Sequence, residues 1–268
     1  MAAKKKQRKS AEEKPTGSVA ALRGRKGGGR KFDRKRVWEG TKSLLGTIAI
    51  FLVLRTFFVE AYRIPSGSMI PSMLIGDMLF VNKLRFGPHL PFTRVNLPGY
   101  AEPRRGEIVV FVSPPQRDQP WDSIPVLVKR LIGMPGDTLH SRDGIVHING
   151  VPQQNGYAVA LPGTPGDFVD PNFDWQKRVQ LKDSRFGPAP DQPTVDDWGP
   201  LVVPEGHYWM MGDNRYNSKD SRFWSFVPRA NVRGRPLFVY WSYDNESCDF
   251  PIHCFWRGRW SRIGHVFK

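Results

Sequence analysis

Residues 125–132 read Pro-Val-Leu-Val-Lys-Arg-Leu-Ile, an apolar run of strand length that carries two adjacent cations. Short apolar or alternating runs between turn-forming residues are typical of β-strands. Similar runs recur along the chain, at residues 77–82, 106–112, 144–149, 207–211 and 237–241. Turns rich in Gly, Pro and Asp separate these runs. The sequence therefore predicts a mainly β, antiparallel domain of the barrel or sandwich type.

Residues 151–200 depart from this pattern, because they are rich in Pro, Gly and Asp and contain few apolar clusters. We expect them to form a small inserted β region within a larger domain that spans residues 61–268. At 268 residues the chain is long enough to bury a core of this size.

An apolar segment precedes the predicted domain. Residues 43–59 read SLLGTIAIFLVLRTFFV. A helix of this length, at about 1.5 Å per residue, spans roughly 25 Å, which suffices for a short membrane crossing. Arg55 lies within about a turn of the expected helix end, where its guanidinium can reach the lipid headgroups. We therefore predict one transmembrane anchor over residues 38–60.

Cations are concentrated before this anchor. Residues 1–42 carry 15 Lys/Arg and 4 Asp/Glu, whereas the rest of the chain carries 25 and 21, so the net charge of +15 belongs mainly to the tail. Residues 1–37 are too polar to form a core, and we expect a disordered tail and no nucleic-acid partner. The positive-inside rule places the tail in the cytoplasm and the β domain outside. A cleaved secretory signal peptide is the alternative, but no Ala-x-Ala site follows the apolar segment.

A serine-rich loop follows the anchor. Residues 64–72 read Ile-Pro-Ser-Gly-Ser-Met-Ile-Pro-Ser, in which Pro restricts the backbone and Gly permits unusual angles. A serine nucleophile needs a base and donors that bind the oxyanion. The hydroxyl of Ser66 and the backbone N–H of Ser68 could converge on such an oxyanion. The alternative interpretation is a linker that is merely rich in serine.

Lys129 is the candidate base, since none of the six histidines lies in a recognisable catalytic context. In a strand that alternates by two, Lys129 shares a face with Leu127 and Leu131, whereas Arg130 would reach solvent. Burial lowers the pKa of a lysine, and a shift from about 10.4 to near 8 costs roughly 3 kcal/mol. The neutral amine can then accept a proton from a serine. The alternative is an edge-strand lysine that opposes aggregation.

A third segment, residues 211–222, reads Met-Gly-Asp-Asn-Arg-Tyr-Asn-Ser-Lys-Asp-Ser-Arg after a predicted strand. One interpretation is a surface loop whose Asp220 and Arg222 form an ion pair of little energetic value. The other is a polar shelf that fixes the amine of Lys129.

Together these segments, in this order and behind an amino-terminal anchor, closely resemble bacterial type I signal peptidase. The resemblance covers about residue 44 to the end, and its pieces lie at residues 55–57, 64–76, 106–111, 128–137 and 212–222. It implies a large antiparallel β domain with a smaller inserted one, which agrees with the pattern above. It further implies a membrane-bound serine endopeptidase that removes signal peptides from secreted preproteins, cutting after small residues of the Ala-x-Ala type.

Carried over residue by residue, the resemblance implies Ser68 as nucleophile and Lys129 as general base. Ser66 would donate to the oxyanion through its hydroxyl, and Ser218 would orient Lys129. Two charged residues would support the shelf structurally, namely Asp220 and Arg222. Shallow substrate pockets would be lined by apolar residues: Ile64, Met69, Met73, Leu127 and Val128. No cofactor and no metal would be needed.

The resemblance also implies a place and partners. We expect a single-pass protein of the bacterial plasma (inner) membrane, whose partners are preprotein substrates, the lipid bilayer and nearby secretion machinery. Two alternatives stay open. One is a specialised Ser/Lys processing peptidase for a conjugation or pilus component, and the other is a membrane-tethered binding protein whose basic tail grips nucleic acid or lipid.

Cys248 and Cys254 flank a short segment, Cys-Asp-Phe-Pro-Ile-His-Cys. In an oxidising compartment we expect a local disulfide, with free thiols as the main alternative. A metal site that includes His253 is a weaker interpretation, because a fourth ligand is not at hand.

Overall fold

The computed structural model describes residues 34–89, 93, 95–116, 125–154, 158–161, 166–182, 184–244 and 257–267. It divides into two units, Met1–Thr47 and Ile48–Lys268. Cys248 and Cys254 lie outside the described residues, and so do residues 1–33 of the predicted tail.

The apolar segment is helical. Helix α1 covers Arg34–Val53 and continues as a π-helical turn, Leu54–Phe58. Within the described residues, one helical stretch is long and apolar enough to cross a membrane, the 22 residues Val37–Phe58, none of which is buried. The helix begins within the predicted tail, because residues 34–37 already belong to α1. It ends before residue 60, because strand β1 pairs with β2 from Val59 onward.

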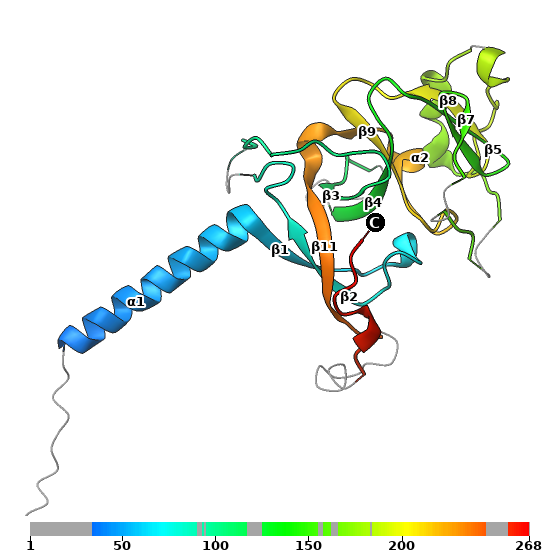
Figure 1. Cartoon of the computed structure of the whole chain (residues 1–268). Coiled ribbons are helices and arrows are strands. Elements are labelled where there is room, and N and C mark those ends of the chain that lie inside the picture. Colours follow the sequence, from blue (N-terminus) through cyan, green and yellow to red (C-terminus); the bar gives the residue numbers. More distant parts are fainter. Residues whose placement is uncertain are drawn as a thin grey trace, which may run out of the picture. The chain divides into compact units, whose positions relative to one another are not determined.

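A large antiparallel sheet of seven strands dominates the second unit (Figure 1). The strand order is β1-β2-β11-β3-β4-β9-β10, and neighbouring strands run antiparallel throughout. Its strands are β1 (Val59–Arg63), β2 (Asp77–Asn82), β3 (Ile108–Val112), β4 (Val126–Gly133), β9 (His207–Met211), β10 (Val227–Pro228) and β11 (Val232–Ser242). The prediction of a mainly β, antiparallel fold is therefore confirmed.

A smaller antiparallel sheet has the order β7-β6-β5-β8. Its strands are β5 (Thr138–Arg142), β6 (Ile145–Ile148), β7 (Val151–Pro152) and β8 (Trp198–Val202). The small sheet thus starts at Thr138, before the region predicted as the insertion, because β8 returns from the far end of that region to pair with β5. Between β7 and β8 the described residues include three 3₁₀ turns: Pro171–Phe173, Gln176–Arg178 and Ser184–Phe186.

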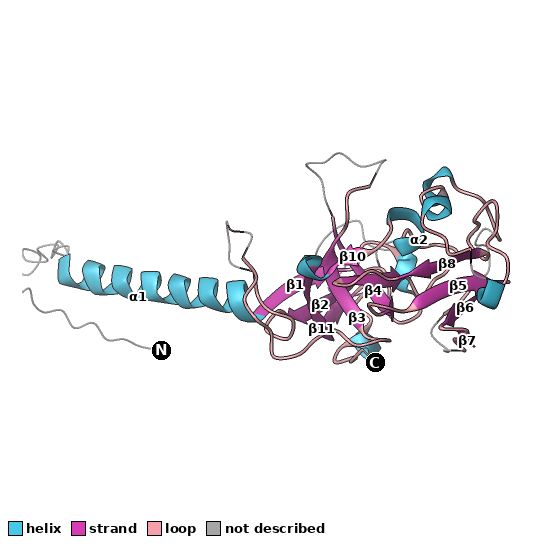
Figure 2. Cartoon of the chain, turned by 90° about the horizontal axis from the view of Figure 1, so that it is seen from above, coloured by secondary structure: helices cyan, strands magenta, loops and turns pink. Residues whose placement is uncertain are grey.

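The two sheets share a hydrophobic core. Trp198 of the small sheet and Trp209 of β9 stack with their ring centroids 5.0 Å apart, and both are fully buried. Figure 2 shows that strands and loops make up most of this unit, whereas its helical parts beyond α1 are short. One of them is helix α2 (Ser221–Trp224), and another is the 3₁₀ turn Trp260–Arg262 near the carboxyl end. The site described below lies on β4, on the loop after β1 and on the loop between β9 and α2.

Candidate active site

Ser68 lies in a 3₁₀ turn, Gly67–Met69, on the loop that follows β1. Two hydrogen bonds from the loop after β9 hold this turn. The backbone N–H of Asn214 donates to the carbonyl of Ser68 at 3.1 Å, and its side-chain amide donates to the carbonyl of Gly67 at 3.2 Å. Asn214 is 1 % exposed, so both bonds are shielded from water. The sequence reasoning missed Asn214, although it lies within the segment that was singled out.

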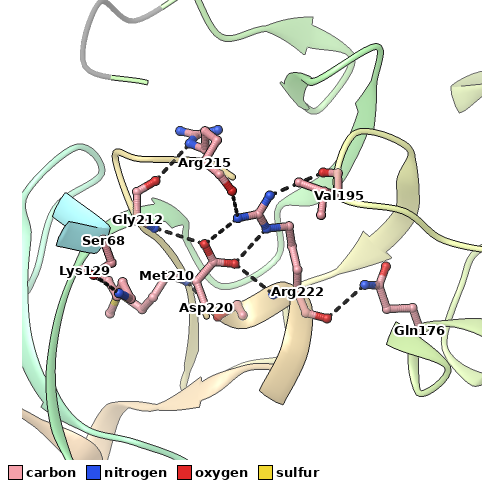
Figure 3. A network of polar contacts seen from close by, with 10 residues as sticks. Ser68, Lys129, Gln176, Val195, Met210, Gly212, Arg215, Asp220 and Arg222 are labelled. Carbon is pink, nitrogen blue, oxygen red and sulfur yellow. Dashed lines mark hydrogen bonds and ion pairs between the residues drawn. The ribbon is translucent and has the colours of Figure 1, made fainter. Parts of the chain in front are cut away.

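Lys129 lies in the middle of β4, where it pairs with Val109 of β3. Only 3 % of its surface is exposed. The amine Nζ lies 2.5 Å from Oγ of Ser68, although the two residues are 61 positions apart in the chain (Figure 3). The structure therefore brings together the two side chains that the sequence proposed as base and nucleophile.

Burial lowers the pKa of Lys129 to about 8, because the surrounding protein replaces the water that would solvate an ammonium. The negative charges of Asp220 and Asp213 oppose this shift, whereas the positive charge of Arg222 adds to it. A lysine with this pKa is partly neutral near pH 7 to 8, so it can accept a proton. The predicted burial of Lys129 matches its position in the structure.

Arg130 does not reach solvent, contrary to the expectation from strand alternation. It is 3 % exposed and forms a two-pronged ion pair with Asp213, with Nε–Oδ1 at 2.8 Å and Nη2–Oδ2 at 2.7 Å. Its Nη1 donates to the carbonyl of Gly106 at 2.7 Å. Both faces of β4 are covered, so the opposite face buries this cation against a carboxylate from the loop after β9. Ser72 of the serine loop joins the pair, since its hydroxyl donates to Asp213 Oδ2 at 2.6 Å.

Asp220 and Arg222 form a second buried ion pair beside Lys129 (Figure 3). Their side chains are 0 % and 1 % exposed, and two bonds of 2.8 Å join the guanidinium to the carboxylate. Asp220 Oδ2 also accepts the backbone N–H of Gly212 at 3.1 Å, and Arg222 donates to the carbonyl of Arg215 at 2.6 Å. The segment is therefore an internal polar shelf and not a solvated surface loop.

Ser218 is 6 % exposed, and its hydroxyl has no hydrogen-bond partner among the described residues. The predicted bond to Lys129 is thus not formed in this arrangement. Gly212 explains how closely the shelf approaches the serine loop. A Cβ at Gly212 would lie 2.5 Å from the carbonyl oxygen of Ser68 and 2.2 Å from the Ser218 hydroxyl, so only glycine fits without movement.

A pocket of about 420 Å³ opens over this pair. Ser66, Ser68, Lys129 and Ser218 line it, and Ser66 is exposed to solvent. Of the five apolar residues predicted to line substrate pockets, Leu127 lines this one. The core cluster beneath the serine loop buries three of the others, Ile64, Met69 and Met73, and the partly buried Val128 packs against it.

The carboxyl-terminal segment, which the sequence reasoning left out, also supports the serine loop. Arg262 pairs with the fully buried Asp77 at 2.5 Å and donates to the carbonyl of Ser72 at 3.1 Å. Phe267 is 3 % exposed and belongs to the same core cluster as Met69. Neither contact has a local sequence signal, because the partners lie about 190 residues apart.

Comparison with known proteins gives this geometry a context. The model of a protein family described as "Signal peptidase, peptidase S26" matches residues 37–241. The chain belongs to this family. A signal peptidase I from Pseudomonas aeruginosa is 33 % identical over 243 residues, covering 85 % of this chain and 78 % of its own. One from Leptolyngbya laminosa is also 33 % identical, covering 76 % and 79 % of the two chains.

Among solved structures, a signal peptidase I from Enterococcus faecalis is 31 % identical, covering 50 % of this chain and 96 % of its own, with a TM-score of 0.31. The predicted family and the prediction of a serine peptidase are confirmed by the family model and the sequence relatives. A binding protein without enzymatic activity and a specialised processing peptidase are not favoured. The described residues contain no group of three or more His, Cys, Asp or Glu side chains that could hold a metal ion.

Proposed function

We propose that this chain is a membrane-anchored serine endopeptidase that removes amino-terminal signal peptides from preproteins, cutting after small residues. The observation that carries the proposal is the 2.5 Å contact between the Lys129 amine and the Ser68 hydroxyl, together with the lowered pKa of that amine. A serine hydroxyl beside a partly neutral lysine has both the nucleophile and the base that amide hydrolysis requires.

In the first step the neutral Lys129 amine takes the hydroxyl proton while Ser68 Oγ attacks the carbonyl carbon of the scissile bond. The Ser66 hydroxyl and the Ser68 backbone N–H stabilise the oxyanion that forms. The Lys129 ammonium then protonates the leaving amine, which becomes the new amino terminus of the mature protein. A water molecule, activated by the same amine, hydrolyses the acyl-enzyme. Ser218, whose hydroxyl lacks another partner among the described residues, would orient Lys129 after a small rotation.

The anchor and its charge asymmetry support a location. Val37–Phe58 is of membrane-spanning length, and residues 1–42 carry 15 cations against 4 acids. The positive-inside rule then places the tail in the cytoplasm and the β domain on the outer side of the bacterial inner membrane. There it would meet preproteins as the secretion machinery delivers them.

The proposal is tested by incubating the purified full chain, in detergent or in lipid vesicles, with a preprotein. We expect cleavage after the small residue at the end of the signal peptide, as read by sequencing the new amino terminus. Ser68→Ala should lose all cleavage, because no other hydroxyl replaces the nucleophile. Cleavage by Ser68→Ala at the wild-type rate would contradict the assignment. Ser141→Ala, another buried serine without a place in the site, is the matched control and should cleave normally.

The activity should depend on pH through Lys129. Because its pKa is about 8, kcat/KM should be half-maximal near pH 8 and fall about tenfold for each pH unit further down. The value of kcat/KM falls as the pH falls, because protonation of Lys129 removes the base. A pH profile of peptide cleavage between pH 5 and 9 checks this. A flat profile would exclude Lys129 as the base.

A further inference from the structure

A second cavity adjoins the pocket over Ser68 and Lys129. It has a volume of about 160 Å³ and room for a single side chain. Both cavities are lined by the same four residues: Gln116, Lys219, Phe223 and Trp224. The two cavities therefore form one groove that runs from the reacting pair across helix α2 toward the 3₁₀ turn Gln176–Arg178.

The far end of this groove is cationic. Arg178 and Lys219 line the second cavity, and both are exposed. Two half-buried aromatic residues, Trp175 and Phe223, line the same cavity. Such a groove suits an extended polar peptide that carries an acidic side chain. The aromatic residues can pack against the aliphatic part of that side chain, and the cations can pair with its carboxylate.

The chemistry of the substrate indicates which of its segments lies here. The preprotein has small residues and the apolar signal helix on the amino-terminal side of its scissile bond. A groove lined by two cations does not suit such a segment. On the carboxyl-terminal side begins the mature protein, which is polar. The first residues of the mature protein therefore fit this groove.

We propose, on the basis of the proposed function, that Arg178 and Lys219 form a specificity subsite for an acidic side chain near the start of the mature sequence. The subsite acts on the preprotein before cleavage. An Asp or Glu placed there raises kcat/KM, and a Lys or Arg lowers it. Both effects weaken as salt screens the exposed charges.

The experiment uses the full chain in detergent and a set of peptides that share one signal-peptide cleavage site. Each peptide carries Ala, Asp or Lys at one of the first mature positions. For wild type, we expect the Asp peptide to be cleaved with a kcat/KM about fivefold above that of the Lys peptide at one of these positions. Arg178→Glu combined with Lys219→Glu should invert this ratio, and Arg178→Glu alone should move it partway. The ratio is measured within each variant, so a general loss of activity does not affect it.

Lys182→Glu is the matched control, because Lys182 is exposed but lines a different cavity, and it should keep the wild-type ratio. Equal cleavage of Asp and Lys peptides by wild type at every position would overturn the subsite, and so would an unchanged ratio in the double variant. A control that shifts the ratio as far as the double variant would overturn it as well, since the effect would then be one of net charge. Failure of wild type to cleave even the Ala peptide would instead overturn the proposed function, and the subsite with it.

Discussion

Lys129→Met is expected to abolish signal-peptide cleavage and at the same time to stabilise the fold. The loss of activity should be about 10³-fold or more in kcat, because Met has nearly the length of Lys but cannot accept a proton. The methionine side chain fits the apolar surroundings on β4, where Lys129 is 3 % exposed. Cleavage of a peptide substrate by the purified full chain measures the first effect, and thermal or denaturant unfolding measures the second.

The gain in stability follows from the pKa of Lys129. In the unfolded chain the pKa is the ordinary 10.5, and burial lowers it to about 8 in the folded protein. Between these two pH values the unfolded chain binds more protons, so the free energy of unfolding of wild type rises with pH across that window. Below pH 8 the folded protein carries the full cost of a buried ammonium. Met removes this cost, which should raise the free energy of unfolding by about 3 kcal/mol at pH 7 and by little near pH 10.5.

Ser68→Ala is the matched control for this prediction. It should abolish cleavage equally, but it keeps Lys129 and therefore should not gain stability in a pH-dependent way. A Lys129→Met protein that is no more stable than wild type at pH 7 would contradict the lowered pKa. A variant that cleaves at more than a small fraction of the wild-type rate would contradict the role of the amine.

Residue type and strand alternation predict part of this site locally, whereas the roles of Ser68 and Ser218 follow from the family resemblance. A lysine within the run around residue 129 indicates a buried amine, and Pro and Gly around Ser68 indicate a shaped loop. The burial of Arg130 could not be predicted in this way. Alternation assumes that one face of a strand meets water, whereas residues 129–133 of β4 are all buried, so both of its faces are covered there. Its partner Asp213 is 83 residues away in the chain, so a local sequence pattern cannot predict this ion pair.

The small sheet illustrates the same limit. The segment of β5, Thr-Leu-His-Ser-Arg, is largely polar, and that of β8, Trp-Gly-Pro-Leu-Val, contains the Gly-Pro pair that usually signals a turn. Their strand character comes from pairing with each other across more than fifty residues, from Thr138 with Val202 to Ser141 with Trp198. Local propensity therefore placed the boundary of the insertion too late, whereas the apolar strands β2, β3, β4 and β9 of the larger sheet, and the second half of β11, could be predicted from sequence.

Asp220→Asn is expected to destabilise the fold strongly and to move the pH profile of cleavage to lower pH. Asn has the same shape but no charge, so the guanidinium of Arg222, 1 % exposed, would be left buried without its counter-ion. Removing one partner of a buried ion pair costs about 3–5 kcal/mol of unfolding free energy. The side-chain carbonyl oxygen of Asn can still accept the hydrogen bond from the backbone N–H of Gly212, so this bond within the shelf need not be lost.

The shift of the pH profile distinguishes an electrostatic role of Asp220 from a merely structural one. The negative charge of Asp220 raises the pKa of Lys129 against the effect of burial, and the charge of Arg222 lowers it. Without Asp220 the ammonium loses an attractive neighbour and keeps a repulsive one, so its pKa should fall below 8 and a larger fraction of the amine is neutral at pH 7. Asp137→Asn is the matched control, because Asp137 is also a buried carboxylate paired with an arginine, Arg105, but does not act on Lys129. It should lose stability without moving the acidic limb of kcat/KM. An Asp220→Asn protein whose acidic limb stays at the wild-type pH, or moves upward, would show that this carboxylate supports the fold alone and does not tune the base.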